Sequence, residues 1–318
     1  MSFASDAQLE MARGECESAA CARCELCAAL LASGGISLQG FGRFRVRLVS
    51  SEATVVRRCF TLLKKYFGIT GELRVLKTEQ FGGMTRYQLV LPDESARGLL
   101  DQLMLLDTDS LFGLRQTPSE ELFEDDDCRV AFLRAAYLFC GTMTNPERAY
   151  HIEFDTPSEE FARIVMEMLN KFKIQAKNTC RKSKEVVYLK GSEEVCDVLT
   201  LLGAHKSVLD LENVRIAKEL RNQVNRQINC DNSNINRSVM TAERQIKDIQ
   251  YIEEELGLDK LPRTLQEIAR IRVDYPETSL SGIGELLTPP LGKSGVNARL
   301  RRISEIAAKL EAGEEIDI

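Results

Sequence analysis

Two stretches of this 318-residue chain resemble each other, and this internal repetition constrains the fold more than any other feature. They lie at residues 25–36 and 132–143, and each reads as a short apolar helix rich in alanine. Each helix ends at a glycine, Gly34 or Gly141, the residue that most easily adopts a left-handed helix C-cap. A chain that repeats a sequence unit is expected to repeat a unit of structure.

The segments that follow the two helices also agree in kind and order. Alternating and β-branched residues predict strands, and apolar residues at helical spacing predict helices. The predicted elements of the first copy are strands at 36–39 and 44–49, a helix at 51–67, strands at 72–77 and 86–91 with a turn at Gly82-Gly83, and a helix at 94–106. Those of the second copy are a strand at 150–155, a helix at 158–172, a strand at 186–190 and a helix at 192–202.

This repetition predicts an α+β fold built from a duplicated αββαββα unit. The duplicated domain is predicted to occupy residues 1–210, with its two copies at about 21–110 and 128–205. Ser51 and Ser158 precede the middle helix of each copy. Because serine side chains accept hydrogen bonds from the first free amides of a helix, both are predicted N-caps.

The remainder of the chain is predicted to be helical. Residues 211–232 are predicted as a basic helix, at 213–227, followed by a linker. The linker is the segment 229–236, which is rich in Asn, Asp and Ser. Residues 233–318 are predicted to form an all-α domain. Its predicted helices lie at 241–256, 265–273, 280–287 and 294–310.

The last two predicted helices have the pattern of a helix-turn-helix, in which a short helix supports a second helix that lies in the DNA major groove. Ser279 caps the short helix, and Pro289 and Pro290 prevent it from continuing. The final helix has an apolar stripe and an opposite polar side with no acidic residue between positions 293 and 302. The predicted apolar stripe consists of Val296, Leu300, Ile303, Ala307 and Leu310. Asparagine and arginine pair with adenine and guanine edges, and lysine at a helix start suits phosphate. The predicted DNA contacts are Lys293, Ser294, Asn297, Arg299, Arg301 and Arg302.

An ordinary surface helix with a solvated basic face would show the same residues, so the wider sequence matters. The stretch 286–303, which reads LLTPPLGKSGVNARLRRI, closely resembles the WhiA family, and so do residues 226–236 and 244–252. The repeated helices resemble the LAGLIDADG helices of homing endonucleases, a domain that WhiA proteins share. The resemblance implies a transcriptional regulator that binds double-stranded DNA and is linked to sporulation or to cell division and chromosome segregation. Another transcriptional regulator or RNA polymerase stays open as a further partner.

Homing endonucleases of the LAGLIDADG class carry a carboxylate near the end of each repeated helix, where two acids hold divalent metal ions. Aligning the repeats on Gly34 and Gly141 places Ser33 and Cys140 at these positions. Neither is a hard oxygen anion, so the sequence predicts a scaffold without nuclease activity. The alternatives are an active endonuclease, which these residues disfavour, and a module that binds a protein partner. No catalytic residue is predicted, and both histidines, His151 and His205, are interpreted as structural.

Ten cysteines raise the question of a metal site. Cys16, Cys21, Cys24 and Cys27 lie close together, and four thiols can hold zinc or an iron–sulfur cluster. No further CxxC pair and no CxxH occurs elsewhere in the sequence. Buried, reduced thiols are therefore the preferred interpretation, and no metal or cofactor is predicted.

The net charge of −6 gives no overall signal of nucleic-acid binding, so the positions of Lys and Arg decide the question. Arg43, Arg45 and Arg47 alternate along one predicted strand and share a face, and basic residues recur between 171 and 184. Phosphate contact by this sheet and solvated edge charge both stay open. Without a signal peptide or an apolar run that could cross a bilayer, the protein is expected in the cytoplasm, associated with the nucleoid and not with a membrane.

Overall fold

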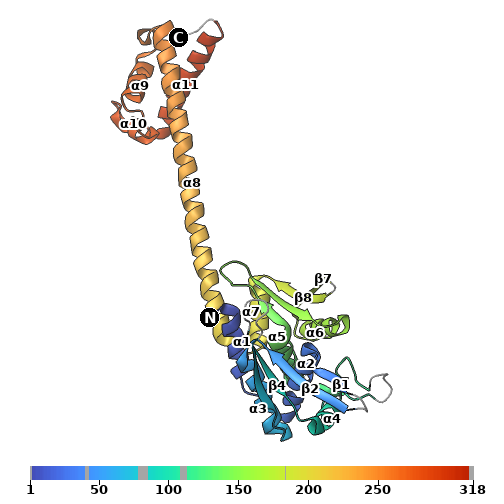
Figure 1. Cartoon of the computed structure of the whole chain (residues 1–318). Helices are drawn as coiled ribbons and strands as arrows, with labels where there is room; N and C mark the ends of the chain where they lie inside the picture. Colours follow the sequence, from blue (N-terminus) through green and yellow to red (C-terminus); the bar gives the residue numbers. More distant parts are fainter. Residues whose placement is uncertain (1, 40–42, 78–84, 108–112, 183, 315–318) are drawn as a thin grey trace. The chain divides into compact units, whose positions relative to one another are not determined.

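The computed structural model of the protein describes residues 2–39, 43–77, 85–107, 113–182 and 184–314 (Figure 1). The predicted turn at Gly82-Gly83 lies outside these residues. The chain divides into two compact units, residues 1–218 and residues 219–318. Helix α8 (His205–Glu255) contributes residues to both.

The first unit contains one α+β arrangement twice, which confirms the predicted fold class. The first copy comprises α2 (Ala19–Ser33), β1 (Ile36–Gln39), β2 (Arg43–Ser50), α3 (Ala53–Phe67), β3 (Glu72–Lys77), β4 (Thr85–Val90) and α4 (Asp93–Gln102). The second comprises α5 (Asp126–Cys140), β5 (Gly141–Met143), β6 (His151–Thr156), α6 (Glu159–Lys171), β7 (Lys177–Arg181), β8 (Lys184–Lys190) and α7 (Ser192–Leu201). The sequence did not locate β5, β7, α1 (Phe3–Arg13) or the short 3₁₀ helix η1 (Glu120–Leu122).

Each copy forms a four-stranded antiparallel sheet, and the strand order is equivalent in the two sheets: β1-β2-β4-β3 and β5-β6-β8-β7. In strand β2, the alternation of apolar and basic residues determines which face of the sheet is buried and which is exposed. Phe44, Val46 and Leu48 are buried, whereas Arg43 and Arg47 on the opposite face are exposed. Strands β3 and β7 occupy the same place in their sheets and are exposed along their whole length. This shared topology is what a duplicated unit requires.

Helices α2 and α5 pack against each other and join the two copies (Figure 1). Both helices bury small side chains, among them Ala28 and Ala29 on α2 and Ala135 and Ala136 on α5. The distance between two packed helices depends on the side chains at their contact, and small ones allow a close approach. The repeated alanine-rich helices therefore form the central pair of the unit.

The two copies differ at the glycine that ends this central helix. Gly34 has φ 60° and ψ 30°, so the predicted left-handed cap of α2 is confirmed. Gly141 has φ −86° and ψ 142°, so the same prediction for α5 is wrong. The reason is that α5 continues directly into β5, whose first residue is Gly141 and is extended. Glycine is needed there because a Cβ atom would lie 2.1 Å from the ring of Tyr137.

A buried ion cluster connects three helices of the first unit. The Glu25 carboxylate on α2 accepts two hydrogen bonds from Arg58 of α3, both at 2.6 Å, and one from Arg134 of α5 at 3.3 Å. Arg58 also donates to the carbonyl of Ala12, and Arg134 donates to that of Leu202. Only 2% of Glu25 and 8% of Arg58 is exposed. No sequence pattern predicts this cluster, because its members are far apart along the chain.

The two predicted serine caps of the middle helices have different outcomes. Ser158 caps α6, since its hydroxyl oxygen accepts from the amide of Phe161 at 3.2 Å. Ser51 does not cap α3, which begins at Ala53. Instead, the hydroxyl of Ser50 accepts from the amide of Glu52 at 3.2 Å. Strand β2 extends to Ser50, and the turn that follows moves the start of the helix along the chain.

Helix α8 occupies the place of the predicted linker. Residues 229–236 are helical, so the prediction of an irregular segment there is wrong. No glycine or proline occurs between residues 205 and 255, and Asn, Asp and Ser each cost less than about 0.7 kcal/mol in a helix relative to alanine. Gln227 also donates to Asp231 one turn later, at 3.1 Å. The predicted boundaries after residues 210 and 232 both fall inside α8, and they remain a prediction.

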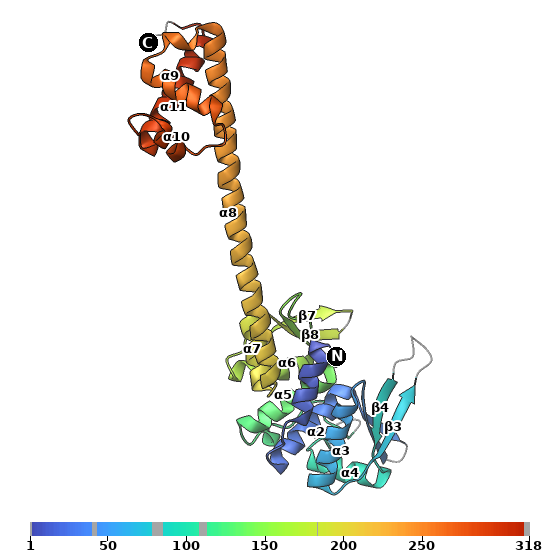
Figure 2. The same ribbon diagram turned by 90° about the vertical axis from the view of Figure 1, so that its left-hand side faces the viewer.

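The second unit packs three helices and the short 3₁₀ helix η2 (Leu258–Lys260) against the C-terminal part of α8 (Figure 2). These helices are α9 (Arg263–Asp274), α10 (Leu280–Leu286) and α11 (Lys293–Glu311). Their common core contains Ile249 and Ile252 from α8, Ile268 from α9, Ile283 from α10 and Leu300 from α11. The predicted all-α character of this region is confirmed.

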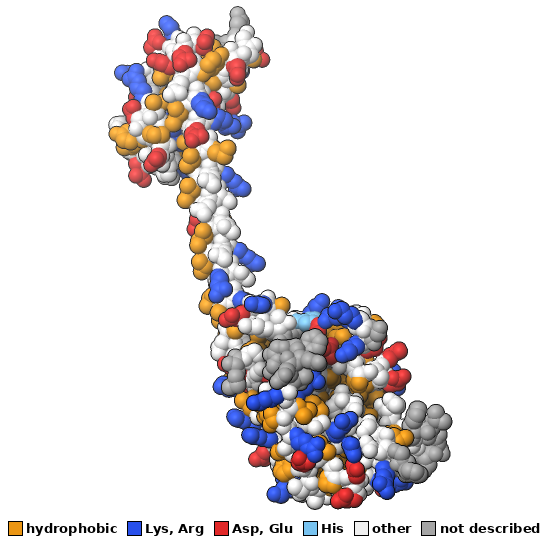
Figure 3. Space-filling view, viewed as in Figure 1, with side chains coloured by type: hydrophobic (Ala, Val, Ile, Leu, Met, Phe, Trp, Pro, Cys, Tyr) orange, Lys and Arg blue, Asp and Glu red, His pale blue; other side chains and the backbone are white. Residues whose placement is uncertain are grey.

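Within the second unit, the part of α8 before this core exposes an apolar face (Figure 3). Its side chains are between 48% and 60% exposed, at Leu220, Val224, Ile228, Ile235 and Val239. Steps of four and seven residues place side chains on the same side of a helix. We call this set the α8 stripe.

Candidate nucleic-acid interface

The short helix α10 and the turn after it form a support for α11. Ser279 caps α10, as predicted, by accepting from the amide of Gly282 at 3.2 Å. The turn then folds back, and the amide of Leu291 donates to the carbonyl of Gly284 at 2.9 Å. A Cβ atom on Gly284 would lie 1.9 Å from the carbonyl oxygen of Leu291. Glycine at this position therefore allows the turn to lie directly on α10.

Helix α11 begins at Lys293, one residue earlier than predicted, and follows Gly292 without a side-chain cap. Its buried side chains are Val296, Leu300, Ile303, Ile306 and Ala307. They include the predicted apolar stripe except Leu310, which is half-buried, and add Ile306. The hydroxyl of Ser304 donates to the carboxylate of Asp248 on α8, which fixes the helix further. These contacts determine which side of α11 faces solvent.

The exposed side of α11 carries most of the predicted contact residues. Ser294, Asn297 and Arg301 are spaced by three and four residues and share one face, and all three are exposed. Lys293 and Arg302 are exposed beside them. We call these five residues the α11 face.

The sixth predicted residue, Arg299, lies at the edge of this set, where its neighbour is Arg302, three positions further along α11. Arg299 is half-buried, and residues two positions apart on a helix, such as Arg299 and Arg301, do not face the same way. The structure therefore brings five of the six candidates together and places Arg299 on the flank.

One acidic residue that sequence reasoning did not consider binds both arginines of this face. The carboxylate of Glu305 lies 3.2 Å from Nε of Arg301 and 3.6 Å from Nη1 of Arg302. The Arg301 side chain is still 79% exposed. Ion pairs at exposed sites contribute only about 0–1 kcal/mol, so both guanidinium groups can exchange Glu305 for another acceptor at little cost.

A buried arginine positions the helices behind this face. Arg272 of α9 is 4% exposed, and its Nε donates to Gln245 of α8 at 3.1 Å. Its Nη1 donates to the carbonyl of Thr278 at 2.8 Å, just before α10. The arginine thus connects α8, α9 and the start of α10. Sequence reasoning missed it because an arginine in an amphipathic helix normally predicts a solvent-facing position.

The end of the α2–α5 pair offers no carboxylate at the two aligned positions. The hydroxyl oxygen of Ser33 is buried and has no hydrogen-bond partner in the described part of the chain. The thiol of Cys140 donates to the carbonyl of Ala136 at 3.0 Å, and burial raises the pKa of Cys140 to about 12. A neutral buried thiol and a hydroxyl are poor ligands for a hard divalent cation, which prefers oxygen anions.

The four cysteines weighed above as ligands of zinc or an iron–sulfur cluster lie in and beside α2. Cys21, Cys24 and Cys27 are buried and Cys16 is half-buried. The thiol of Cys24 donates to the carbonyl of Leu122 at 3.2 Å. Burial raises the pKa of Cys24 and of Cys27, which keeps both thiols protonated. Among the residues that the structure describes, no group of three or more His, Cys, Asp or Glu side chains is arranged to hold a metal ion.

Strand β2 carries three arginines, and one of them forms an ion pair within the protein. Nε of Arg45 lies 3.5 Å from the carboxylate of Asp93, whereas Arg43 and Arg47 are exposed. In the second copy, exposed basic residues occur at Lys171, Lys173, Lys177, Arg181, Lys182 and Lys184. His151 at the start of β6 contacts the carboxylate of Glu153, and His205 is the first residue of α8.

Family models match three consecutive parts of the chain. The WhiA N-terminal LAGLIDADG-like domain matches residues 19–106, the WhiA LAGLIDADG-like domain matches 129–221, and the WhiA C-terminal HTH domain matches 224–307. A protein of Alkaliphilus metalliredigens labelled probable cell division protein WhiA is 37% identical over 99% of this chain and 100% of its own length.

The chain belongs to the WhiA family. A second relative with the same label, from Clostridium beijerinckii, is 38% identical over 99% of this chain and 100% of its own. The crystal structure of full-length WhiA from Thermotoga maritima has a TM-score of 0.59 at 24% identity and covers 97% of this chain and 99% of that one. The fold of this WhiA-family protein is therefore the one found in that crystal structure. No helix in the described part of the chain is both long and apolar enough to span a membrane.

Proposed function

We propose that this WhiA-family protein is a sequence-specific DNA-binding transcriptional regulator that acts in cell division or sporulation. The observation that carries the proposal is the α11 face, on which Ser294, Asn297 and Arg301 lie in register at the start of a helix supported by α10. The N-terminal residues of a recognition helix are those that meet base edges in the major groove. Its duplex target is in the cytoplasm, where the protein would associate with the nucleoid.

The residues of the α11 face have different expected roles. Asn297 suits the N6 and N7 atoms of adenine, and Arg301 suits the O6 and N7 atoms of guanine. Lys293 and the free amides of the first turn of α11 suit a phosphate group. Ser294 and Arg302 flank this set, and Arg299 at its margin is assigned to the DNA backbone rather than to a base.

The LAGLIDADG-like domain acts in this proposal as a scaffold without nuclease activity. Ser33 and Cys140 supply no oxygen anion where metal-dependent cleavage would need one. Incubation of the protein with its selected duplex and Mg²⁺ is expected to leave the DNA intact. Cleavage that depends on Mg²⁺ and is abolished by replacing one acidic residue would contradict this part of the proposal.

A second candidate function is the recognition of a protein partner, such as another transcriptional regulator or RNA polymerase. The α8 stripe favours it, because exposed apolar patches on soluble proteins mark interaction sites. Salt dependence separates the two functions. Affinity for duplex DNA that falls steeply with salt indicates phosphate contacts, whereas assembly that is insensitive to salt indicates an apolar protein interface.

Selection from a pool of random duplexes tests the main proposal. The full chain is incubated with the pool, and the bound fraction is sequenced, in parallel with the double variant Asn297→Ala/Arg301→Ala. An enriched motif that the double variant fails to enrich is the expected result. No enrichment by the unchanged protein would contradict sequence-specific binding and would favour the protein-partner function.

A further inference from the structure

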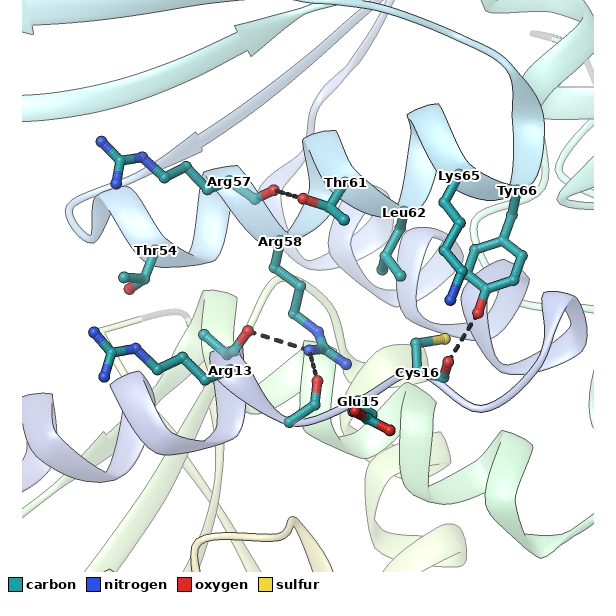
Figure 4. A pocket seen from close by; sticks show the side chains of 12 residues that line it. Arg13, Glu15, Cys16, Thr54, Arg57, Arg58, Thr61, Leu62, Lys65 and Tyr66 are labelled. Atoms are coloured by element: carbon teal, nitrogen blue, oxygen red, sulfur yellow. Dashed lines mark hydrogen bonds between the residues drawn. The ribbon is translucent and has the colours of Figure 1, made fainter.

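A pocket in the first unit lies between the end of α1 and one face of α3 (Figure 4). It encloses about 550 Å³, and one wall is formed by residues 12–16. The other wall is formed by α3 side chains between Thr54 and Tyr66. None of the residues assigned above to DNA recognition lines it, so its chemistry requires a separate explanation.

The α3 wall presents polar side chains in a regular row. Arg57, Thr61 and Lys65 are spaced by four residues, so they project from one side of the helix, and all three are exposed. Arg13, the last residue of α1, stands on the opposite wall. Figure 4 shows the guanidinium groups of Arg13 and Arg57 extending toward the same end of the pocket, with Thr54 between them.

The floor of the pocket is held by bonds that leave it preformed. Arg58 donates to the buried carboxylate of Glu25 and to the carbonyls of Ala12 and Gly14, so it fixes the end of α1 against α3. The hydroxyl of Tyr66 donates to the carbonyl of Cys16 at 2.8 Å, which fixes the loop at the other end. A ligand would therefore meet walls that are already in position.

The charges of the pocket are not balanced by the protein. Arg13, Arg57 and Lys65 have no carboxylate within ion-pair distance among the residues that the structure describes. Glu15 is the one acidic side chain among the described lining residues. Interaction with Tyr66 raises the pKa of Lys65, so this amine stays charged at neutral pH. Lys65 Nζ also lies over the Tyr66 ring, 4.7 Å from its centroid. Three cations without a carboxylate partner, gathered in one concavity of a chain with net charge −6, indicate an anionic ligand.

The kind of anion follows from the geometry of the donors. The planar fork of arginine matches two oxygens of one phosphate group, and lysine adds a point charge. Because the two arginines and the lysine lie toward different ends of the pocket, a single phosphate would not engage all of them (Figure 4). Leu62 and the ring of Tyr66 provide an apolar surface, and small-molecule sites typically enclose about 300–1,000 Å³.

We propose that this pocket binds a small molecule that carries two or more linked phosphate groups. The site shares no residue with the proposed DNA contacts, since it lies in the first unit and α11 belongs to the second. An extended nucleic acid is the less suitable occupant, because the pocket is bounded on both sides by α1 and α3.

Isothermal titration of the full chain tests the proposal with three probes: ATP, inorganic tripolyphosphate and adenosine. ATP and tripolyphosphate are expected to bind saturably at one site, and adenosine is not. Arg13→Ala, Arg57→Ala and Lys65→Ala should each weaken ATP binding about tenfold or more, since a hydrogen bond to a charged group contributes about 1.5–3 kcal/mol. Lys64→Ala is the matched control, because Lys64 is exposed on α3 but does not line the pocket.

Three outcomes would overturn the proposal. The first is no saturable binding of either phosphate probe. The second is an equal loss for Lys64→Ala and Lys65→Ala, which would indicate diffuse surface charge. The third is displacement of ATP by an unrelated duplex at equal phosphate concentration, which would identify the surface as a site for the nucleic-acid backbone. Thermal unfolding of each ligand-free variant verifies its fold, and duplex binding by Arg57→Ala should match that of the unchanged protein.

Discussion

Glu25 and Glu305 each contact two arginines, but they do so in different surroundings. Glu25 is buried where α2, α3 and α5 meet, and it binds Arg58 through two hydrogen bonds of 2.6 Å. Glu305 is on the solvent-facing side of α11 and lies 3.2 Å from Arg301. A buried pair cannot lose one partner without leaving an unpaired charge in the interior, whereas an exposed pair can exchange partners freely. The same residue types therefore tie the helices of the first unit together, but on α11 they leave the arginines able to exchange Glu305 for another acceptor.

The largest effect expected from this comparison concerns stability. Glu25→Gln leaves Arg58 without its counter-charge in the interior, and removal of one partner of a buried pair typically costs about 3–5 kcal/mol. Glu305→Gln is the matched control and should cost less than about 1 kcal/mol. Urea unfolding followed by circular dichroism measures both. Similar losses for the two variants would remove the distinction between the two clusters.

The next largest effect concerns base discrimination. Arg301→Ala should reduce the preference for the selected motif over a duplex changed at one base pair by about 1–3 kcal/mol. Competition binding with the two duplexes measures this preference. Lys309→Ala, at an exposed position near the end of α11, is the control and should leave the preference unchanged. A variant of Arg301 that discriminates normally would show that the guanidinium remains with Glu305 in the complex.

A smaller and different effect is expected at the start of α11. Lys293→Ala removes a phosphate contact, so it should weaken binding to all duplexes to a similar degree. The slope of log K against log salt should become shallower by about 1. Titrations at several salt concentrations, with the selected motif and a scrambled duplex, measure both quantities. A loss confined to the selected motif would instead assign Lys293 to a base.

The smallest expected effect is a change in DNA affinity when the ion pairs of Arg301 and Arg302 with Glu305 are removed. Glu305→Gln removes a negative charge from beside Arg301 and Arg302, and exposed pairs are worth about 0.2–1 kcal/mol. Affinity for duplex DNA should therefore rise by a few fold at most. Fluorescence anisotropy titration measures this affinity. A clearly lower affinity of Glu305→Gln would mean that Glu305 orients the arginines rather than competing with DNA.

The sequence predicted the elements whose side chains repeat with a clear period. Alternation along β2 and the helical spacing in α3 and α6 were sufficient to locate these elements and to recognise the duplication. Strand β7, with the sequence KNTCR, has no apolar alternation and is exposed along its length, so no pattern marked it. The predicted linker failed for the opposite reason: a polar composition suggested a loop where nothing in the sequence interrupts a helix.

The candidate interface was predictable where it depends on one helix and not where it depends on several. Five of the six candidates on α11 share a surface because helical spacing alone determines it. The position of Arg299 at the flank depends on how α11 packs on its neighbours. Glu305 lies outside residues 293–302, the segment without acidic residues from which the contacts were predicted. The buried hydrogen bonds of Arg272 and Glu25 join residues that are distant in sequence. Such contacts can be identified only from the tertiary structure.

Methylation interference on the selected duplex tests whether Arg301 of α11 reads a guanine. Methylation of guanine N7 blocks the atom to which an arginine in the major groove would donate. Methylation of at least one guanine is expected to prevent binding by the full chain. This interference should disappear with Arg301→Ala, whereas Lys309→Ala should retain it. Interference that is unchanged in Arg301→Ala, or absent at every guanine, would contradict base reading by this arginine of α11.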